Sequence, residues 1–233
     1  MLEGNLGIIM PAKPAQGYTR FDDKAVEWDA NPARVTLARA VAAAIREAVP
    51  LQSNMAVMDV GAGTGLVSLA LLPFVREITA VDASSGMLGV LEEKARALGI
   101  TNLHALQGDV AKAELPLGRF DLVVSSMTLH HLPDVPLVLL RLRSLLREGG
   151  WLALADLDVE DGTFHADPAG IYHHGFARET VCRWLEAAGF ADTASREAYR
   201  ITRPGSDGVL RTYPVFLVTA RPGCCKRSSS HCE

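Results

Sequence analysis

The feature that most constrains this chain is a short apolar run that ends in a glycine-rich turn. Residues 56–60 (AVMDV) are followed at once by residues 61–65 (GAGTG). The apolar run predicts a buried strand, and the apolar pattern of residues 66–72 predicts a helix directly after the turn. Glycine is needed where a strand turns sharply into a helix and where a ligand approaches the backbone. The segment therefore predicts a ligand-binding loop between a strand and a helix.

The same alternation of short apolar runs and helical patterns continues along the chain. Further strands are expected at residues 78–81, 103–106, 120–125, 151–155 and 213–220. Further helices are expected at residues 32–49, 87–98, 134–147 and 178–188. Strands that alternate with helices form a parallel sheet with helices on both faces, so the fold class is α/β. In such a sheet the ligand lies beyond the carboxyl ends of the strands, where the strand order reverses.

Composition excludes several broad classes. The chain has 233 residues, 48% of them hydrophobic, which suits one domain, and no apolar run approaches the ~18 residues that span a bilayer. Asp and Glu number 27 and Lys and Arg 23, and this net charge of -4 argues against nucleic acid as the main partner. Three of the four cysteines lie in the last ten residues, so we expect no disulfide framework and a cytoplasmic protein.

Two acidic residues follow neighbouring strands at positions that suit a nucleoside. Asp82 closes the second strand, about 20 residues after the glycine turn, where a carboxylate can accept both ribose hydroxyl protons. Asp109 follows the third strand, where it could accept from an adenine amine. The turn has Leu66 where the dinucleotide fingerprint places its last glycine. A nucleoside without a pyrophosphate is therefore the better ligand for this loop.

Taken together, the motifs resemble the class I S-adenosylmethionine-dependent methyltransferases. VMDVGAGTG resembles their first motif, ITAVD their second and GDV their third-strand acid. FDLVVSSMTLHHLPD and LLREGGWLALAD resemble the fourth and fifth strands of the small-molecule branch, which includes the ubiquinone/menaquinone-type and type 11/12-like enzymes. FDDKAVEWD at residues 21–29 is similar to the N-terminal segment of that branch, which packs over the cofactor. The resemblance runs from about residue 20 to residue 220.

The resemblance implies a Rossmann-like, doubly wound, mostly parallel seven-stranded sheet, with S-adenosyl-L-methionine as cofactor. The glycines would cradle the methionyl part of the cofactor, Asp82 would hold its ribose, and Met87 could cover its adenine. The implied cofactor-binding residues are Trp28, Asp59, Gly61, Ala62, Gly63, Gly65, Asp82, Ala83, Met87, Asp109, Val110 and Ser125, and Ser126 would line the sulfonium region beside Ser125. Core packing is an alternative for Met87 and Trp28, and loop capping for Asp59.

The chain divides into segments of different expected roles. Residues 1–30 are interpreted as an arm or lid over the active site, residues 31–220 as the methyltransferase domain, and residues 221–233 as a disordered tail. Residues 158–177 are too many for a minimal loop between the fifth strand and its helix. We interpret this segment as a substrate-side insertion that forms the acceptor pocket together with residues 1–30.

The chemistry implied is an in-line displacement of the sulfonium methyl group, in which alignment and desolvation supply most of the rate. His130, His165 and Tyr172 are the candidate catalytic residues, because a histidine near the site can take a proton from the acceptor. A simple hydrogen bond from each histidine to a loop is the alternative. No HxxxH or HxH spacing occurs, so no metal is expected.

The acceptor is expected to be a small molecule. The fourth strand ends in Ser-Ser-Met-Thr, whereas enzymes that methylate DNA bases at an amine carry Asn/Asp-Pro-Pro-Tyr or -Phe there. We expect no membrane partner and a monomer or homodimer. Two competing hypotheses remain: an NAD(P)-dependent oxidoreductase on a Rossmann sheet, and a non-catalytic regulator that binds S-adenosylmethionine.

Overall fold

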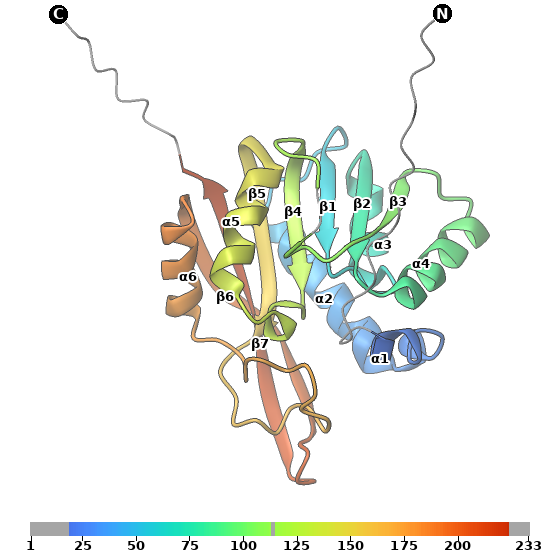
Figure 1. The fold of residues 1–233 in the computed structure, drawn as a ribbon, viewed down its shortest axis with the longest axis vertical. Helices are drawn as coiled ribbons and strands as arrows, with labels where there is room; N and C mark the ends of the chain where they lie inside the picture. Colours follow the sequence, from blue (N-terminus) through green and yellow to red (C-terminus); the bar gives the residue numbers. More distant parts are fainter. Residues whose placement is uncertain (1–18, 113–114, 224–233) are drawn as a thin grey trace, which may run out of the picture.

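The computed structural model describes residues 19–112 and 115–223, which form one sheet flanked by helices (Figure 1). Helices α1 to α6 and the short 3-10 helices η1 to η3 alternate with strands β1 to β7. In chain order the elements are α1 (Thr19–Asp22), η1 (Trp28–Ala30), α2 (Pro32–Ala48), β1 (Ala56–Val60), α3 (Leu66–Leu71), η2 (Leu72–Phe74), β2 (Glu77–Asp82), α4 (Ser85–Ala97), β3 (Leu103–Gln107), β4 (Phe120–Ser126), η3 (Leu129–His131), α5 (Val135–Leu145), β5 (Leu146–Leu157), α6 (Arg178–Ala187), β6 (Phe190–Pro204) and β7 (Leu210–Pro222).

The sheet confirms the predicted fold class. Its seven strands run in the order β3-β2-β1-β4-β5-β7-β6. Strands β1 to β5 are parallel, while β7 pairs antiparallel with both β5 and β6. The strand order reverses at β1, between β2 and β4, so the carboxyl ends of these strands are the expected ligand edge.

Alternate residues of each strand feed two cores, one on each face of the sheet. Val57 of β1 packs in a cluster with Ile45 of α2 and Leu71 of α3. Its neighbour Met58 packs in the opposite cluster with Leu142 of α5. Side chains alternate across a strand, so a strand that is buried on both faces must be apolar throughout. This requirement explains the continuous apolar runs that made the central strands predictable.

Side-chain caps fix the starts of two of the expected helices. The side chain of Asn31 accepts a hydrogen bond from the backbone N–H of Ala33 at 3.0 Å, and Pro32 is the first residue of α2. Asp134 caps α5 in the same manner, accepting from the N–H of Leu137 at 3.0 Å. Both starts are confirmed. Helix α5 ends two residues earlier than expected, because the chain has already entered β5 at Leu146.

Strand β6 was not predicted. It lies at the edge of the sheet, and most of its residues are exposed or half-buried, so polar and charged residues such as Arg196, Glu197 and Arg200 interrupt any apolar run. Pairing with β6 extends β7 to Pro222, so Arg221 and Pro222 belong to the sheet and the expectation that they begin a disordered tail is wrong. The remaining tail, residues 224–233, lies outside the described residues.

The segment 158–177 crosses beside the β6–β7 hairpin and has almost no regular structure. A single parallel bridge joins Asp158 to Phe176, and the Arg178 guanidinium donates to the Asp158 carboxylate at 2.7 Å. Gly175, at φ +71°, lies directly against the carbonyl oxygen of Asp158. Any side chain at this position would collide with backbone that is fixed by the bridge.

We predict that Gly175→Ala destabilises the protein more than Gly99→Ala. Both glycines have a left-handed φ, which costs alanine ~1–2 kcal/mol. A Cβ at Gly99 meets nothing within 4 Å, whereas a Cβ at Gly175 overlaps the backbone of Asp158. Urea unfolding of the two variants measures the difference in the free energy of unfolding. Equal losses in both would show that residues 158–177 move aside and are not held as described.

Candidate functional site

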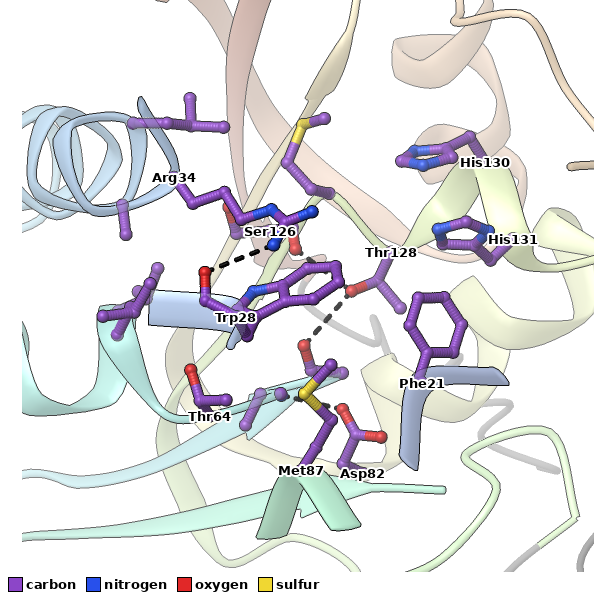
Figure 2. Close-up of a pocket in the computed structure, with 18 of the residues that line it drawn as sticks. Phe21, Trp28, Arg34, Thr64, Asp82, Met87, Ser126, Thr128, His130 and His131 are labelled. Carbon is purple, nitrogen blue, oxygen red and sulfur yellow. Dashed lines mark hydrogen bonds between the residues drawn. The ribbon is translucent and has the colours of Figure 1, made fainter. Parts of the chain in front are cut away.

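A cavity of about 630 Å³ opens at the carboxyl ends of β1, β2 and β4, at the predicted edge of the sheet (Figure 2). Its wall contains the glycine loop, the ends of β1 to β3, the 3-10 helix η3 and the first turn of α2. Strand β6 and residues 158–177 supply the rest of the wall. This size suits a small-molecule ligand.

Most of the residues predicted for the site line this cavity. They are Trp28, Asp59, Gly61, Ala62, Gly63, Asp82, Ala83, Met87, Asp109, Val110, His130 and His165. Ser126, which was expected to line the sulfonium region, is also in the wall. Segments far apart in the sequence therefore contribute side chains and backbone to one enclosed space.

Three predicted residues do not line the cavity. Gly65 caps the N-terminus of α3 and lies against Leu91. The buried Ser125 hydroxyl donates to the carbonyl oxygen of Val60 at 2.9 Å, so it joins β4 to β1. The Tyr172 side chain is 59% exposed, although its backbone N–H donates to the carbonyl oxygen of His130 at 2.9 Å. These three residues support the site and do not face it.

The glycine loop is held open by a carboxylate from the next strand. Asp82 accepts hydrogen bonds from the backbone N–H groups of Gly63 at 2.7 Å and Ser84 at 2.8 Å. Burial raises the pKa of Asp82, and these hydrogen bonds only partly offset the effect. Gly63 has φ +55° and a Cβ there would meet nothing within 4 Å, so its backbone borders open space. The loop thus forms a cradle that a side chain would partly fill.

A second carboxylate lies beneath the loop. Asp59 at the end of β1 is only 1% exposed and accepts a hydrogen bond from the Ser68 hydroxyl at 2.6 Å. The pKa of Asp59 is raised to about 6: burial is the largest cause, the nearby charge of Asp82 adds to it, and the hydrogen bond from Ser68 acts against it. Near neutral pH the site therefore holds a buried negative charge that a cation can offset.

Two acids fasten the N-terminal segment to the side of the cavity that the glycine loop and α4 form. The Asp22 carboxylate accepts from the Ser84 hydroxyl at 2.6 Å and from the Gly86 N–H at 2.7 Å. The Asp29 carboxylate binds Lys94 and the Thr64 hydroxyl, both at 2.6 Å. Phe21 and Trp28 of the same segment line the cavity, and Figure 2 shows the Trp28 ring between Arg34 and Met87. Residues 1–18 of the expected arm lie outside the described residues.

A histidine and an aspartate form a buried pair at the opposite side of the cavity. His130 Nδ1 lies 2.6 Å from a carboxylate oxygen of Asp156, and the two residues are 1% and 0% exposed. Burial alone would raise the pKa of Asp156, but the charge and hydrogen bonds of His130 hold it below its ordinary value. The carboxylate fixes the proton on Nδ1 and leaves Nε2 as a proton acceptor. Asp156 was not among the residues predicted for the site.

His165 lies beside this pair but has a different electrostatic character. Its ring centroid is 4.9 Å from that of His130. The pKa of His165 is lowered to about 3, mainly by burial and also by the charges of His130, His131 and Arg203. Its Nε2 is buried and makes no hydrogen bond with the described part of the chain. His165 is therefore a neutral group with an unused hydrogen-bonding atom at neutral pH.

Two arginines of the cavity wall were missed. Arg34 comes from the first turn of α2 and Arg203 from β6. Neither belongs to a recognisable motif, and β6 itself was not expected. In the sequence, Tyr199 and Ile201 alternate with Arg200 and Thr202, and this period of two could have suggested a strand there.

Comparison with known proteins identifies the family. The sequence model of a methyltransferase domain family matches residues 34–195, which is more than half of the chain. The chain therefore belongs to this methyltransferase family, which confirms the resemblance to class I S-adenosylmethionine-dependent enzymes. The curated relatives include an uncharacterised methyltransferase of Schizosaccharomyces pombe, 34% identical over 60% of this chain and 55% of the relative. The chain thus spans little more than half of that relative.

Two further proteins show the range of the similarity. Trans-aconitate 2-methyltransferase of Deinococcus radiodurans is 29% identical over 70% of this chain and 69% of its own length. The crystal structure of phosphoethanolamine N-methyltransferase 2 of Haemonchus contortus with S-adenosyl-L-methionine superposes with a TM-score of 0.66 at 16% identity. That match covers 88% of this chain and 60% of the other, and at this identity it shows a shared fold.

Two searches of the described residues gave negative results. None of the helices in residues 19–112 and 115–223 is long and apolar enough to cross a membrane. Within the same residues, no group of three or more His, Cys, Asp or Glu side chains is arranged to hold a metal ion.

We predict that Asp59→Asn stabilises the protein at neutral pH while weakening its cofactor binding. Because the folded-state pKa of Asp59 is about 6 and the ordinary value is 3.8, the native state pays for ionising this group as the pH rises from 4 to 6. Asparagine removes a cost on the order of 2–3 kcal/mol and can still accept from Ser68. Urea unfolding of the wild-type protein and of Asp59→Asn, from pH 4.5 to 7.5, measures the difference in their free energies of unfolding. A stability difference that is independent of pH would contradict the assignment.

Proposed function

We propose that this protein is an S-adenosylmethionine-dependent methyltransferase that methylates a small molecule. Membership of the methyltransferase family supports this activity. The observation that carries the proposal is the glycine cradle at the end of β1, with the Asp82 carboxylate bound to its backbone and facing the cavity. A carboxylate in this position suits a ribose diol, and the open backbone of Gly63 suits a chain that passes close to it.

The residues of the cavity fit the parts of this cofactor. Asp82 would accept from the ribose hydroxyls, and the buried Asp59 would face the ammonium group of the methionyl part. Asp109 and Val110 would meet the adenine edge, and the buried Met87 would pack on its face. When bound, S-adenosylmethionine supplies a methyl group on a positively charged sulfur, and the carbon–sulfur bond breaks with its electron pair left on sulfur.

The His130–Asp156 pair would prepare the acceptor. With the proton of His130 held on Nδ1 by Asp156, the Nε2 atom can take a proton from an acceptor oxygen or nitrogen as that atom bonds to the methyl carbon. Asp156 is then a positioning residue, since it orients the imidazole and stabilises its charged form. His165 would contribute a neutral hydrogen-bonding atom in the same wall. Tyr172 does not face the cavity, so we no longer propose it as catalytic.

The acceptor side of the cavity is built from parts outside the cofactor motifs. Phe164 and His165 come from residues 158–177, Phe21 and Trp28 from the described part of the N-terminal segment, and Arg203 from β6. This arrangement supports our interpretation of residues 158–177 as a substrate-side insertion in a domain that begins at residue 31 and extends to the end of β7 at Pro222. It also supports the interpretation of the N-terminal segment as a cover. The relative that acts on trans-aconitate supports a small-molecule acceptor. We further propose a cytoplasmic protein, as a monomer or homodimer.

The competing oxidoreductase hypothesis has less support. A dinucleotide needs room for a pyrophosphate at a helix N-terminus, but Leu66 occupies the position of the last fingerprint glycine. Calorimetry with S-adenosylmethionine and with NAD distinguishes the two cofactors directly. A protein that binds S-adenosylmethionine but transfers its methyl group to none of a broad panel of acceptors would instead support the regulator hypothesis.

We predict that Asp82→Ala lowers the affinity for S-adenosylmethionine by ~1–3 kcal/mol, because a bidentate polar partner is lost and the loop loses its anchor. The matched control is Asp134→Ala, which also removes a carboxylate that accepts from backbone but does not line the cavity. Calorimetry at pH 7.5 should show normal affinity for the control. Unaltered affinity of Asp82→Ala, or equal losses in both variants, would refute the ribose assignment.

We also predict that His130→Ala lowers kcat about 10²-fold or more and leaves the dissociation constant of S-adenosylmethionine within twofold. Asp156→Asn should lower kcat less and move the pH profile of kcat, because the imidazole loses its negative partner. These assays use the compound that incorporates most label when a panel of small molecules is incubated with the protein and methyl-labelled S-adenosylmethionine. His174→Ala, on an exposed histidine, is the control. Normal kcat in His130→Ala would exclude it as the base.

A further inference from the structure

Arg34 and Arg203 lie in the same cavity wall, each stacked on an aromatic ring. The Arg34 guanidinium is 3.7 Å from the centre of the Trp28 ring, as Figure 2 illustrates, and that of Arg203 is 4.7 Å from the centre of the Phe164 ring. The two side chains are near enough for the charge of Arg203 to act on Arg34. Partial burial, followed by this charge, lowers the pKa of Arg34. The fold thus brings two like charges together in a partly buried place.

Neither of these arginines has a carboxylate partner among the described residues. Arg34 donates to the carbonyl oxygen of Trp28 at 3.2 Å, and Arg203 to that of Phe164 at 2.7 Å. Asp29, the acid whose charge reaches Arg34, already binds Lys94 and Thr64. Two partly buried guanidinium groups without a counter-ion are unfavourable unless a ligand supplies the negative charge.

Charge is divided between the two ends of the cavity. Asp59 lies in β1, Asp82 ends β2 and Asp109 follows β3, and together they make the cofactor end acidic. Arg34 and Arg203 lie in the wall that α2 and β6 form, and the Asp156 carboxylate is held by a hydrogen bond to Nδ1 of His130. The neutral His165 is close enough to Arg203 to feel its charge, and its buried Nε2 has no partner in the described chain. A cation and an anion would therefore be drawn to opposite ends of one cavity.

We propose that the methyl acceptor carries an oxyanion, a carboxylate or a phosphate, which binds between the guanidinium groups of Arg34 and Arg203, with a polar atom of the acceptor on His165. This inference rests on the proposed function in placing the acceptor in this part of the cavity. A guanidinium presents its N–H groups in a planar fork that fits two oxygens of one anion. The stacking of each guanidinium on a ring holds it in place before the ligand arrives.

The test measures anion binding without relying on methyl transfer. Tricarballylate, glycerol 3-phosphate and uncharged glycerol are titrated by calorimetry into protein saturated with S-adenosylhomocysteine, at pH 7.5 and constant ionic strength. At least one anion should bind and glycerol should not. The anion with the higher affinity shows whether the site prefers a carboxylate or a phosphate. Arg34→Gln and Arg203→Gln should each weaken that anion tenfold or more, and the double variant should abolish its binding.

Two matched controls separate a specific site from general charge. Arg39→Gln removes an exposed positive charge from α2, and Arg200→Gln removes one from β6. Both should bind the anion as the wild-type protein does. Melting temperature and affinity for S-adenosylhomocysteine show whether each variant is folded. The proposal is overturned if neither anion binds wild-type protein, if glycerol binds equally well, or if the control variants lose as much affinity as Arg34→Gln and Arg203→Gln.

The same experiment keeps this inference distinct from the proposed function. If the protein binds an anion through Arg34 and Arg203 but does not bind S-adenosylhomocysteine, the anion site is supported and the proposed cofactor is refuted. If the protein binds S-adenosylhomocysteine but neither anion, the proposed cofactor is supported and the anion site is refuted. A screen with methyl-labelled donor then compares each carboxylic acid with its carboxamide. Label should enter the acids preferentially in the wild-type protein, and this preference should fall tenfold in Arg203→Gln.

Discussion

The whole site depends on one carboxylate that joins two strand ends. Asp82 accepts hydrogen bonds from the N–H groups of Gly63 and Ser84. The loop after β1 and the start of α4 are therefore held together at the edge where the strand order reverses. The charge on this group is stabilised by backbone dipoles and disfavoured by burial. A ligand with hydroxyl groups would offset the cost of burying the Asp82 carboxylate, because its hydroxyl groups would donate the hydrogen bonds that water gives to an exposed carboxylate. The rest of the cavity is assembled around this fixed point.

Burial gives the ionisable groups of the cavity different roles. The pKa of Asp59 is raised to about 6, mainly by burial, whereas the charge and hydrogen bonds of His130 outweigh burial and hold the pKa of Asp156 below its ordinary value. His165 is buried without an acid and stays neutral. The same physical effect therefore yields a carboxylate suited to a cation, an oriented imidazole and an uncharged hydrogen-bonding group. A reaction between a cationic methyl donor and an acceptor that loses a proton needs groups of each kind.

The sequence predicted the cofactor half of the site better than the acceptor half. The central strands β1 and β4 are buried along almost their whole length, and the glycines and acids at the strand ends occur at fixed positions, so a local pattern was enough. Ser125 was misplaced because a strand turns neighbouring side chains to opposite sides, which brings Ser126 into the cavity and Ser125 onto Val60. Tyr172 was misplaced because residues 158–177 follow no period from which a direction could be inferred.

By itself the sequence determined the fold class, the ligand edge of the sheet and the chemical type of the cofactor loop, because periodicity, glycine and strand-end acids are local properties of the chain. Only the tertiary structure decided what faces the acceptor. Arg34 and Arg203 are far apart in the sequence. They line the same cavity because β6 pairs with β7 and packs against α2. His130 obtains its acid from β5 in the same way. Such contacts arise when distant segments pack together, and no local pattern encodes them.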